Sequence, residues 1–340
     1  MGNYSTIQQN SLDALHWLSG HGPQGRPCAG SPPPLLVGGD SSGGGSAISL
    51  VLRLQADKGS GPPIAGAFVF SPWTNLKCDT PTYYLNAFGE RRSADKEATV
   101  YTGDVIFQGA PAENSASYRD TALAYVGHDD SALTDPIASP FFLTASEVRD
   151  SPPFFIAVGD SESIAGDSWI FASKLAHAGA RVYLDVYAGM WHVFPMYSEG
   201  CGSGNALWQG LLSLNRTAEF VRAAAAAASA GGLLRSCGDG LDLRVSMHYG
   251  ETWIPVEPLQ VGCVEVFGSS PSIASATHGP ILVAATVACI CGVCLGLACL
   301  RLPRITVRQQ ASEDRLNLKE EGQSAPPAHS FGQAELERTL

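Results

Sequence analysis

The sequence predicts an α/β fold built on a parallel sheet, followed by one membrane-spanning helix. Two observations predict the sheet. Short apolar runs typical of buried strands recur along residues 1–232, and segments with apolar residues at helical spacing lie between them. A third observation predicts the span, because residues 281–300 are apolar and uncharged.

The predicted elements follow one another in a regular order. The apolar runs typical of strands are PPPLLVGG, IAGAFVF, PPFFIAVGD and RVYLDVYAG, and helical patterns lie at 11–22, 46–54, 166–180 and 217–230. Residues 75–151 are rich in turn residues and favour loops and short helices. Strands that alternate with helices along a chain pair in parallel, which predicts the parallel sheet.

Ile281 to Leu300 are predicted to cross a membrane as a helix. At helical rise these twenty residues cover roughly 30 Å, the hydrocarbon thickness of a bilayer. The alternative is a buried core helix, but such helices seldom run this long without a polar face. Basic residues follow the span and none lies in the twenty residues before it, so we expect a single pass with a cytoplasmic tail and the preceding domain lumenal or extracellular.

Glycines in the span suggest a second role for it. Gly292 and Gly296 form G-x-x-x-G, a pattern typical of closely packed helix pairs, although an ordinary lipid-facing span is the preferred alternative. The order along the chain therefore predicts four regions. These are the α/β domain at 1–232, a small strand-rich stem at 233–278, the span at 279–300 and a disordered tail at 301–340.

Charge and cysteine placement exclude two classes of function. The chain has 21 Lys and Arg against 32 Asp and Glu, a net charge of −11, which disfavours nucleic acid as a partner. Four of the nine cysteines lie inside the predicted span, where a thiol behaves as a small apolar group. CGVC at 291–294 is therefore not expected to be a zinc site. We expect no metal and no cofactor.

GDSSG at 39–43 fits the G-x-S-x-G turn that presents a nucleophilic serine. An apolar strand leads into this turn and a helix leaves it, so Ser41 lies at a helix N-terminus, where the amide of Ser42 would face a developing oxyanion. The alternative is a glycine loop that cradles a phosphate. No Gly-Lys-Ser/Thr follows, however, and the glycines do not fit G-x-G-x-x-G.

A base and an acid follow the serine along the chain. Asp160 and Glu162 lie at the end of one predicted strand, and His192 directly follows a later one. The carboxyl ends of parallel strands share one crevice, so these side chains are expected to converge on Ser41. The alternative for His192 is an imidazole packed beside Trp191 and Phe194.

Several motifs together resemble one known family. GDSSGGG is followed by SPWTNL, DPIASPFF, PPFFIAVGDSE and GMWHVF, and a helix like LDALHWL precedes them. This set resembles the hormone-sensitive-lipase-like family of carboxylesterases and lipases, also called the α/β-hydrolase fold-3 family. The resemblance implies that residues 1–232 form the C-terminal half of an α/β-hydrolase parallel sheet. By position it implies Ser41 as nucleophile, His192 as base and Glu162 as acid, with Asp160 as the alternative acid.

The resemblance also implies segments that the chain does not have. Family members carry an upstream HGGG segment, an N-terminal cap and four earlier strands, and this chain begins after them, so we expect an incomplete sequence or a degraded fold. The expected activity is hydrolysis of small-molecule or lipid acyl esters through a Ser-Glu-His triad. The alternative is a catalytically impaired, membrane-anchored hydrolase remnant or a ligand-binding module.

Overall fold

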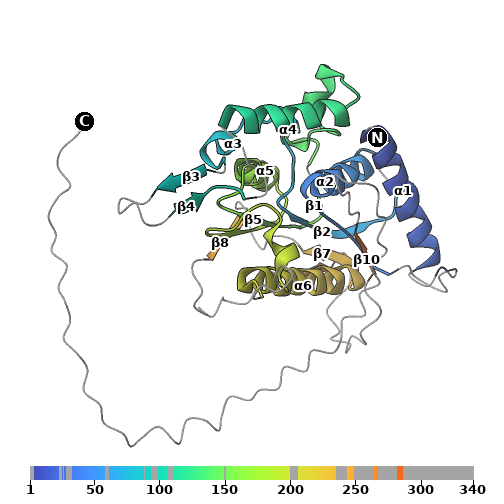
Figure 1. Ribbon diagram of the computed structural model, residues 1–340. Coiled ribbons are helices and arrows are strands. Elements are labelled where there is room, and N and C mark those ends of the chain that lie inside the picture. The colour runs from blue at the N-terminus through green and yellow to red at the C-terminus, as the bar shows by residue number, and fades with distance from the viewer. Residues whose placement is uncertain are drawn as a thin grey trace, which may run out of the picture. The chain divides into compact units, whose positions relative to one another are not determined.

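Six parallel strands form the central sheet of the computed structural model (Figure 1). The structure describes residues 4–22, 25, 27, 33–57, 61–87, 89–92, 99–105, 111–148, 151–199, 206–234, 243–248, 264–266 and 282–285. Across the sheet the strands are β10 (Leu282–Ala285), β1 (Leu35–Asp40), β2 (Ile64–Phe70), β5 (Phe154–Gly159), β6 (Val182–Tyr187) and β8 (Leu243–His248). The predicted α/β fold with a parallel sheet is confirmed.

Helices cover both faces of this sheet (Figure 1). On one side lie α1 (Tyr4–His21), α2 (Ser41–Ala56) and α5 (Ala165–His177), and on the other lies α6 (Trp208–Ser229). Successive residues of a strand point to opposite faces, so Leu35 and Val37 pack toward α2 while Leu36 packs toward α6. Strands covered on both sides need continuous apolar runs, which explains why every residue of β5 is buried.

The region between β2 and β5 is more ordered than its sequence suggests. It contains α3 (Thr82–Leu85), the hairpin β3 (Gly89–Arg92) and β4 (Thr99–Thr102), α4 (Pro111–Tyr125), and 3-10 turns at Asp130–Thr134 and Pro140–Phe142. The prediction of loops and short helices missed the 15-residue α4. Between residues 116 and 125 this helix buries mainly Tyr118 and Ala122, which leaves little apolar periodicity to detect.

The sheet continues past residue 232, the predicted end of the α/β domain. β8 lies in the predicted stem, yet it pairs in parallel with β6 from Val182↔Leu243 to Tyr187↔His248. These residues are therefore a strand of the main sheet. Elsewhere in the predicted stem, β9 (Val264–Val266) pairs with β7 (Gly232–Leu234) in a separate two-stranded sheet.

The start of the predicted membrane span is a strand in the structure. Leu282–Ala285 form β10, which pairs with β1 from Leu35↔Leu282 to Gly38↔Ala285. The prediction of a helix is wrong for these four residues, because a short apolar run fits a buried strand as well as a span. No helix in the described part of the chain is long and apolar enough to cross a membrane. The rest of the span, with Gly292 and Gly296, and the tail at 301–340 lie outside the described residues.

β10 also bears on the expected open edge of the sheet. Without the four earlier strands that family members carry, the elbow strand β1 would have one edge unpaired. In the structure β2 lies on one side of β1 and β10 on the other. Both edges of β1 therefore have a hydrogen-bonding neighbour along the paired residues.

A buried ion pair joins β6 to α6. Asp185 is 1 % exposed, and its carboxylate accepts hydrogen bonds from Nε and Nη2 of Arg216, the second at 2.8 Å. The imidazole of His248 lies 3.4 Å from the same carboxylate. Burial raises the pKa of Asp185, but the hydrogen bonds from Arg216, together with the nearby imidazole of His248, outweigh that effect and hold it below its ordinary value.

Candidate active site

Ser41 lies at the sharp turn between β1 and α2. Its backbone has φ of 53°, a left-handed conformation that is strained for a residue with a side chain. The glycines on either side allow this turn. A Cβ atom on Gly39 would collide with the carbonyl of Gly43, and one on Gly45 would collide with the carbonyl of Trp73. The glycine-rich sequence thus brings strand, turn and helix close enough to project the serine hydroxyl.

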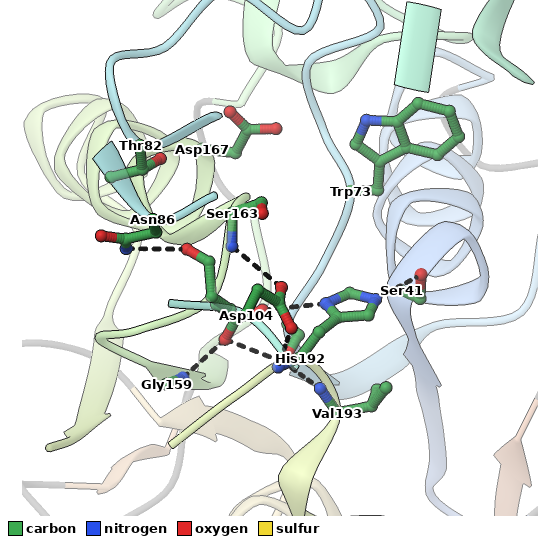
Figure 2. A network of polar contacts seen from close by, with 12 residues as sticks. Ser41, Trp73, Thr82, Asn86, Asp104, Gly159, Ser163, Asp167, His192 and Val193 are labelled. Carbon is green, nitrogen blue, oxygen red and sulfur yellow. Dashed lines mark hydrogen bonds and ion pairs between the residues drawn. The ribbon is translucent and has the colours of Figure 1, made fainter. Parts of the chain in front are cut away.

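His192 lies between Ser41 and Glu162, and Figure 2 shows its ring directed toward Ser41. Its Nε2 lies 2.8 Å from Oγ of Ser41, and its Nδ1 lies 2.9 Å from Oε2 of Glu162. A carboxylate only accepts hydrogen bonds, so the proton is assigned to Nδ1, and Nε2 is left to accept from the serine hydroxyl. The structure therefore brings three of the residues singled out in the sequence into one hydrogen-bonded chain.

Glu162 is fully buried, and its carboxylate has three donors. Besides His192, these are the backbone N–H of Gly159 and the hydroxyl of Ser71, 3.0 Å away. Burial raises the pKa of Glu162 well above its ordinary value, whereas the hydrogen bonds from Gly159 and Ser71 lower it. These donors stabilise the ionised form that accepts from an imidazole.

Asp160, the alternative acid, points elsewhere. Its Oδ1 accepts from the backbone N–H of Gly189 at 2.7 Å and from the hydroxyl of Ser161 at 2.9 Å. The contact to Nδ1 of His192 belongs to Glu162. The geometry thus favours Glu162 over Asp160 as the partner of the imidazole.

The electrostatics of His192 suit a neutral base. Burial lowers the pKa of this imidazole, and the charges of Asp104 and Asp40 oppose that effect without cancelling it. A pKa below the ordinary histidine value leaves the ring unprotonated at neutral pH. In that form Nε2 can take a proton from the hydroxyl of Ser41.

Ser42, the expected oxyanion donor, is the second residue of α2. Backbone N–H groups in the first turn of a helix point outward along its axis, toward the N-terminal end. Here that end is occupied by Ser41. The oxyanion role of the Ser42 amide stays a prediction.

Three residues near the site were missed in the sequence: Ser71, Asn86 and Asp104. Ser71 follows β2 and has φ of 46°; its Oγ donates to Glu162 and accepts from the N–H of Val193. Ser71 is the first residue of the SPWTNL motif, which could have identified it from the sequence. Asn86 and Asp104 flank the β3–β4 hairpin, where no pattern in the sequence marks them.

Within the described ranges, no cluster of His, Cys, Asp and Glu has the geometry to hold a metal ion.

A parallel sheet with a serine at its strand-to-helix elbow defines the α/β-hydrolase class of folds. A family model described as alpha/beta hydrolase fold matches residues 3–196, more than half of the chain. The chain belongs to this family, and the resemblance to hormone-sensitive-lipase-like esterases is confirmed. A search of the curated proteins returned no match.

Solved structures with a similar backbone include bacterial esterases. An esterase/lipase from an uncultured bacterium is 21% identical with a TM-score of 0.48, and the match covers 66% of this chain and 62% of that one. EstE5 soaked with p-nitrophenyl butyrate is 21% identical with a TM-score of 0.49 and the same coverage. An esterase of the bacterial hormone-sensitive lipase family is 22% identical, with a TM-score of 0.48 and coverage of 65% and 61%. The chain thus spans less than two thirds of the length of these structures.

Proposed function

We propose that this protein is a serine hydrolase of carboxylic esters, with Ser41 as nucleophile, His192 as general base and Glu162 as the acid that orients the imidazole. One observation carries the proposal. The Oγ of Ser41, the two ring nitrogens of His192 and the carboxylate of Glu162 form a continuous chain of contacts at 2.8 and 2.9 Å. Membership of an esterase-containing family supports the same reaction class.

The reaction follows from this geometry. Oγ of Ser41 attacks the acyl carbonyl while Nε2 of His192 takes its proton, and the tetrahedral oxyanion faces the amide of Ser42. The imidazolium then gives its proton to the leaving alcohol, which leaves an acyl group on Ser41. Water attacks this ester with His192 again as base, which releases the carboxylic acid and restores the serine.

The substrate class follows from the nucleophile and the family. An activated serine attacks acyl carbonyls, and EstE5 was soaked with such an ester, p-nitrophenyl butyrate. We propose small-molecule or lipid acyl esters as substrates, without cofactor or metal. Membrane attachment through residues 281–300 stays a prediction.

A fluorophosphonate probe and a p-nitrophenyl ester together test the proposal. We expect the probe to label wild-type protein at Ser41, and both labelling and hydrolysis to disappear in Ser41→Ala. Removal of the base in His192→Gln is expected to lower kcat by about 10³-fold or more.

The acid is tested by a matched pair of variants. Glu162→Gln is expected to lower kcat far more than Asp160→Asn, because only the first removes the partner of Nδ1. Equal losses would contradict the assignment of Glu162. A folded protein that binds esters but neither turns them over nor reacts with the probe would favour the alternative, a catalytically impaired hydrolase remnant or ligand-binding module.

A further inference from the structure

The hairpin between β2 and β5 carries a carboxylate that the proposed triad does not use. Asp104 follows β4 and is completely buried, although a buried charge is costly unless it is paired. Its two oxygens contact two different loops. Oδ2 accepts from the backbone N–H of Ser163 at 2.9 Å, and Oδ1 accepts from the backbone N–H of His192 at 3.3 Å (Figure 2).

These two amides belong to the loops that carry the acid and the base. Ser163 directly follows Glu162 at the end of β5, and His192 follows β6. One carboxylate therefore bridges both loops at the level of the backbone. The contact between Nδ1 of His192 and Glu162 depends on the relative position of the same two loops.

Asp104 is itself tied to the acid loop through Asn86. The N–H of Asp104 donates to the carbonyl of Asn86 at 2.9 Å. The side-chain amide of Asn86 donates to the carbonyls of Asp160 and Glu162 at 2.7 and 3.0 Å. Asn86 and Asp104, the two residues that flank the hairpin, thus hold both loops. Together they bind two carbonyls and one amide of the loop that carries Glu162, and one amide of the loop that carries His192.

We propose that Asp104 is a positioning residue, which fixes the acid loop against the base loop and contributes negative charge beside His192. This inference rests on the proposed hydrolase function. When Ser41 loses its proton to Nε2, the imidazole becomes an imidazolium. Glu162 then faces Nδ1 of the imidazolium. Asp104 supplies a second negative charge beside the backbone N–H of His192.

Among the described residues, the charged and titratable groups around this point are Glu162, Asp40, Tyr118 and the imidazole itself. Burial raises the pKa of Asp104 and the charge of Glu162 raises it further, whereas His192 and the two backbone amides lower it. Burial raises the pKa of Tyr118, and the charges of Asp104 and Glu162 act in the same direction. His192 is the cationic partner in this group once it takes the proton of Ser41, so loss of the Asp104 charge should lower the pKa of the imidazole.

The test measures the pKa of the His192 imidazole by NMR, with the signal assigned by its loss in His192→Gln. Asp104→Asn keeps an oxygen acceptor but removes the charge, and Asp120→Asn makes the same change at an exposed position of α4. We expect Asp104→Asn to lower the pKa by on the order of one unit, and Asp120→Asn to leave it unchanged. Asp104→Glu, which keeps the charge, should lie closer to wild type than Asp104→Asn.

This readout does not require ester hydrolysis, so it separates the inference from the proposed function. An unchanged His192 pKa in folded Asp104→Asn would overturn the role of the charge, whether or not the protein is active. If the protein is active, the acid limb of kcat/KM should move to lower pH in Asp104→Asn, and kcat should fall with little change in KM.

The loop-fixing role has its own readout, in a variant that keeps the charge. Asn86→Ala leaves Asp104 in place but removes the two hydrogen bonds to the acid loop. We expect faster hydrogen exchange at the amides of Ser163 and His192, with the exchange of the β5 amides unchanged. Wild-type exchange at both amides would show that the hairpin does not hold these loops.

Discussion

Three residues in the candidate site have strained backbones, and two of them, Ser71 and Val193, are in direct contact. Ser41, Ser71 and Val193 have φ of 53°, 46° and 51°. Ser71 accepts from the N–H of Val193, next to His192, and donates to Glu162. Positive φ costs of order 1–3 kcal/mol at a residue with a side chain, so the surrounding contacts must hold it. The hydroxyl of Ser71 thus connects two of these strained turns to the acid of the proposed triad.

The first prediction concerns Ser71. Ser71→Ala removes the donor to Glu162 and the acceptor for Val193, each worth about 1 kcal/mol. We expect kcat for a p-nitrophenyl ester to fall by about tenfold or more with KM little changed. Ser71→Gly, which relieves the positive φ but also lacks the hydroxyl, should lose a similar factor in kcat. A wild-type kcat in both variants would rule out a contribution of this hydroxyl.

The second prediction follows from the lowered pKa of His192. A base acts in its neutral form, so activity rises as pH increases through the pKa of the imidazole. Burial lowers that pKa, which places the acid limb of kcat/KM below the ordinary histidine value. The pH profile of wild-type hydrolysis checks this, and a limb above the ordinary value would contradict it.

The sequence identified some of these residues and missed others for physical reasons. Ser41 stood out because the glycines that its turn requires are local. The choice of Glu162 over Asp160 came from a family resemblance, since both carboxylates follow the same strand. Asp104 left no local signal because its partners, Ser163 and His192, lie 59 and 88 residues away in the chain.

At the scale of elements, a buried ion pair fixes α6 against the sheet. The pKa of Asp185 is depressed, so the pair stabilises the fold at pH values above the unfolded pKa, and this stability is lost as pH falls through the folded pKa. Arg216→Met leaves a buried carboxylate without its cation. We expect a loss of about 3–5 kcal/mol at neutral pH in urea unfolding.

The matched control for Arg216→Met removes both charges. The double variant Asp185→Leu and Arg216→Met should recover much of the lost stability, because no unpaired charge remains. As pH falls through the folded pKa of Asp185, the stability gap between Arg216→Met and wild type should narrow. A constant gap across that range would contradict the assigned ion pair.

The sequence predicts that residues 282–285 begin a membrane span, whereas the structure places them in strand β10. An uncharged apolar run suits a buried strand and a membrane span equally, so the pattern alone could not decide. Proline substitutions distinguish a buried strand from a membrane-spanning helix at these positions. Proline at Val283 or Ala284 removes a backbone N–H, and of two adjacent N–H groups in a strand one faces the neighbouring strand.

We therefore expect Val283→Pro or Ala284→Pro to lower the melting temperature of the domain if β10 pairs with β1 in solution. Both positions fall in the first turn of the predicted helix, where proline is tolerated, so a membrane span would be little affected. The measurements are thermal unfolding and retention in membranes after expression. Unchanged melting in both variants, with full membrane retention, would favour the span.

For the whole molecule, composition and periodicity predicted the sheet and the order of its first elements. They did not predict where the sheet ends. β8 was expected in a stem because the alternation at 241–249 shows a strand but not its partner. That partner, β6, lies some sixty residues earlier, and pairing over such distances is decided by tertiary packing.

The contact between Ser41 and His192 spans 151 residues, and both residues follow strands of one continuous sheet. This contact cannot form early in folding, because β2 and β5 lie between β1 and β6 in the sheet. The ends of β1 and β6 come together only after those two strands have paired. Reactivity toward a fluorophosphonate should consequently disappear at the same urea concentration as the circular dichroism signal of the domain. The serine would then serve as a built-in reporter of folding, and labelling that outlasts the sheet would reveal a partly folded state that retains the nucleophile.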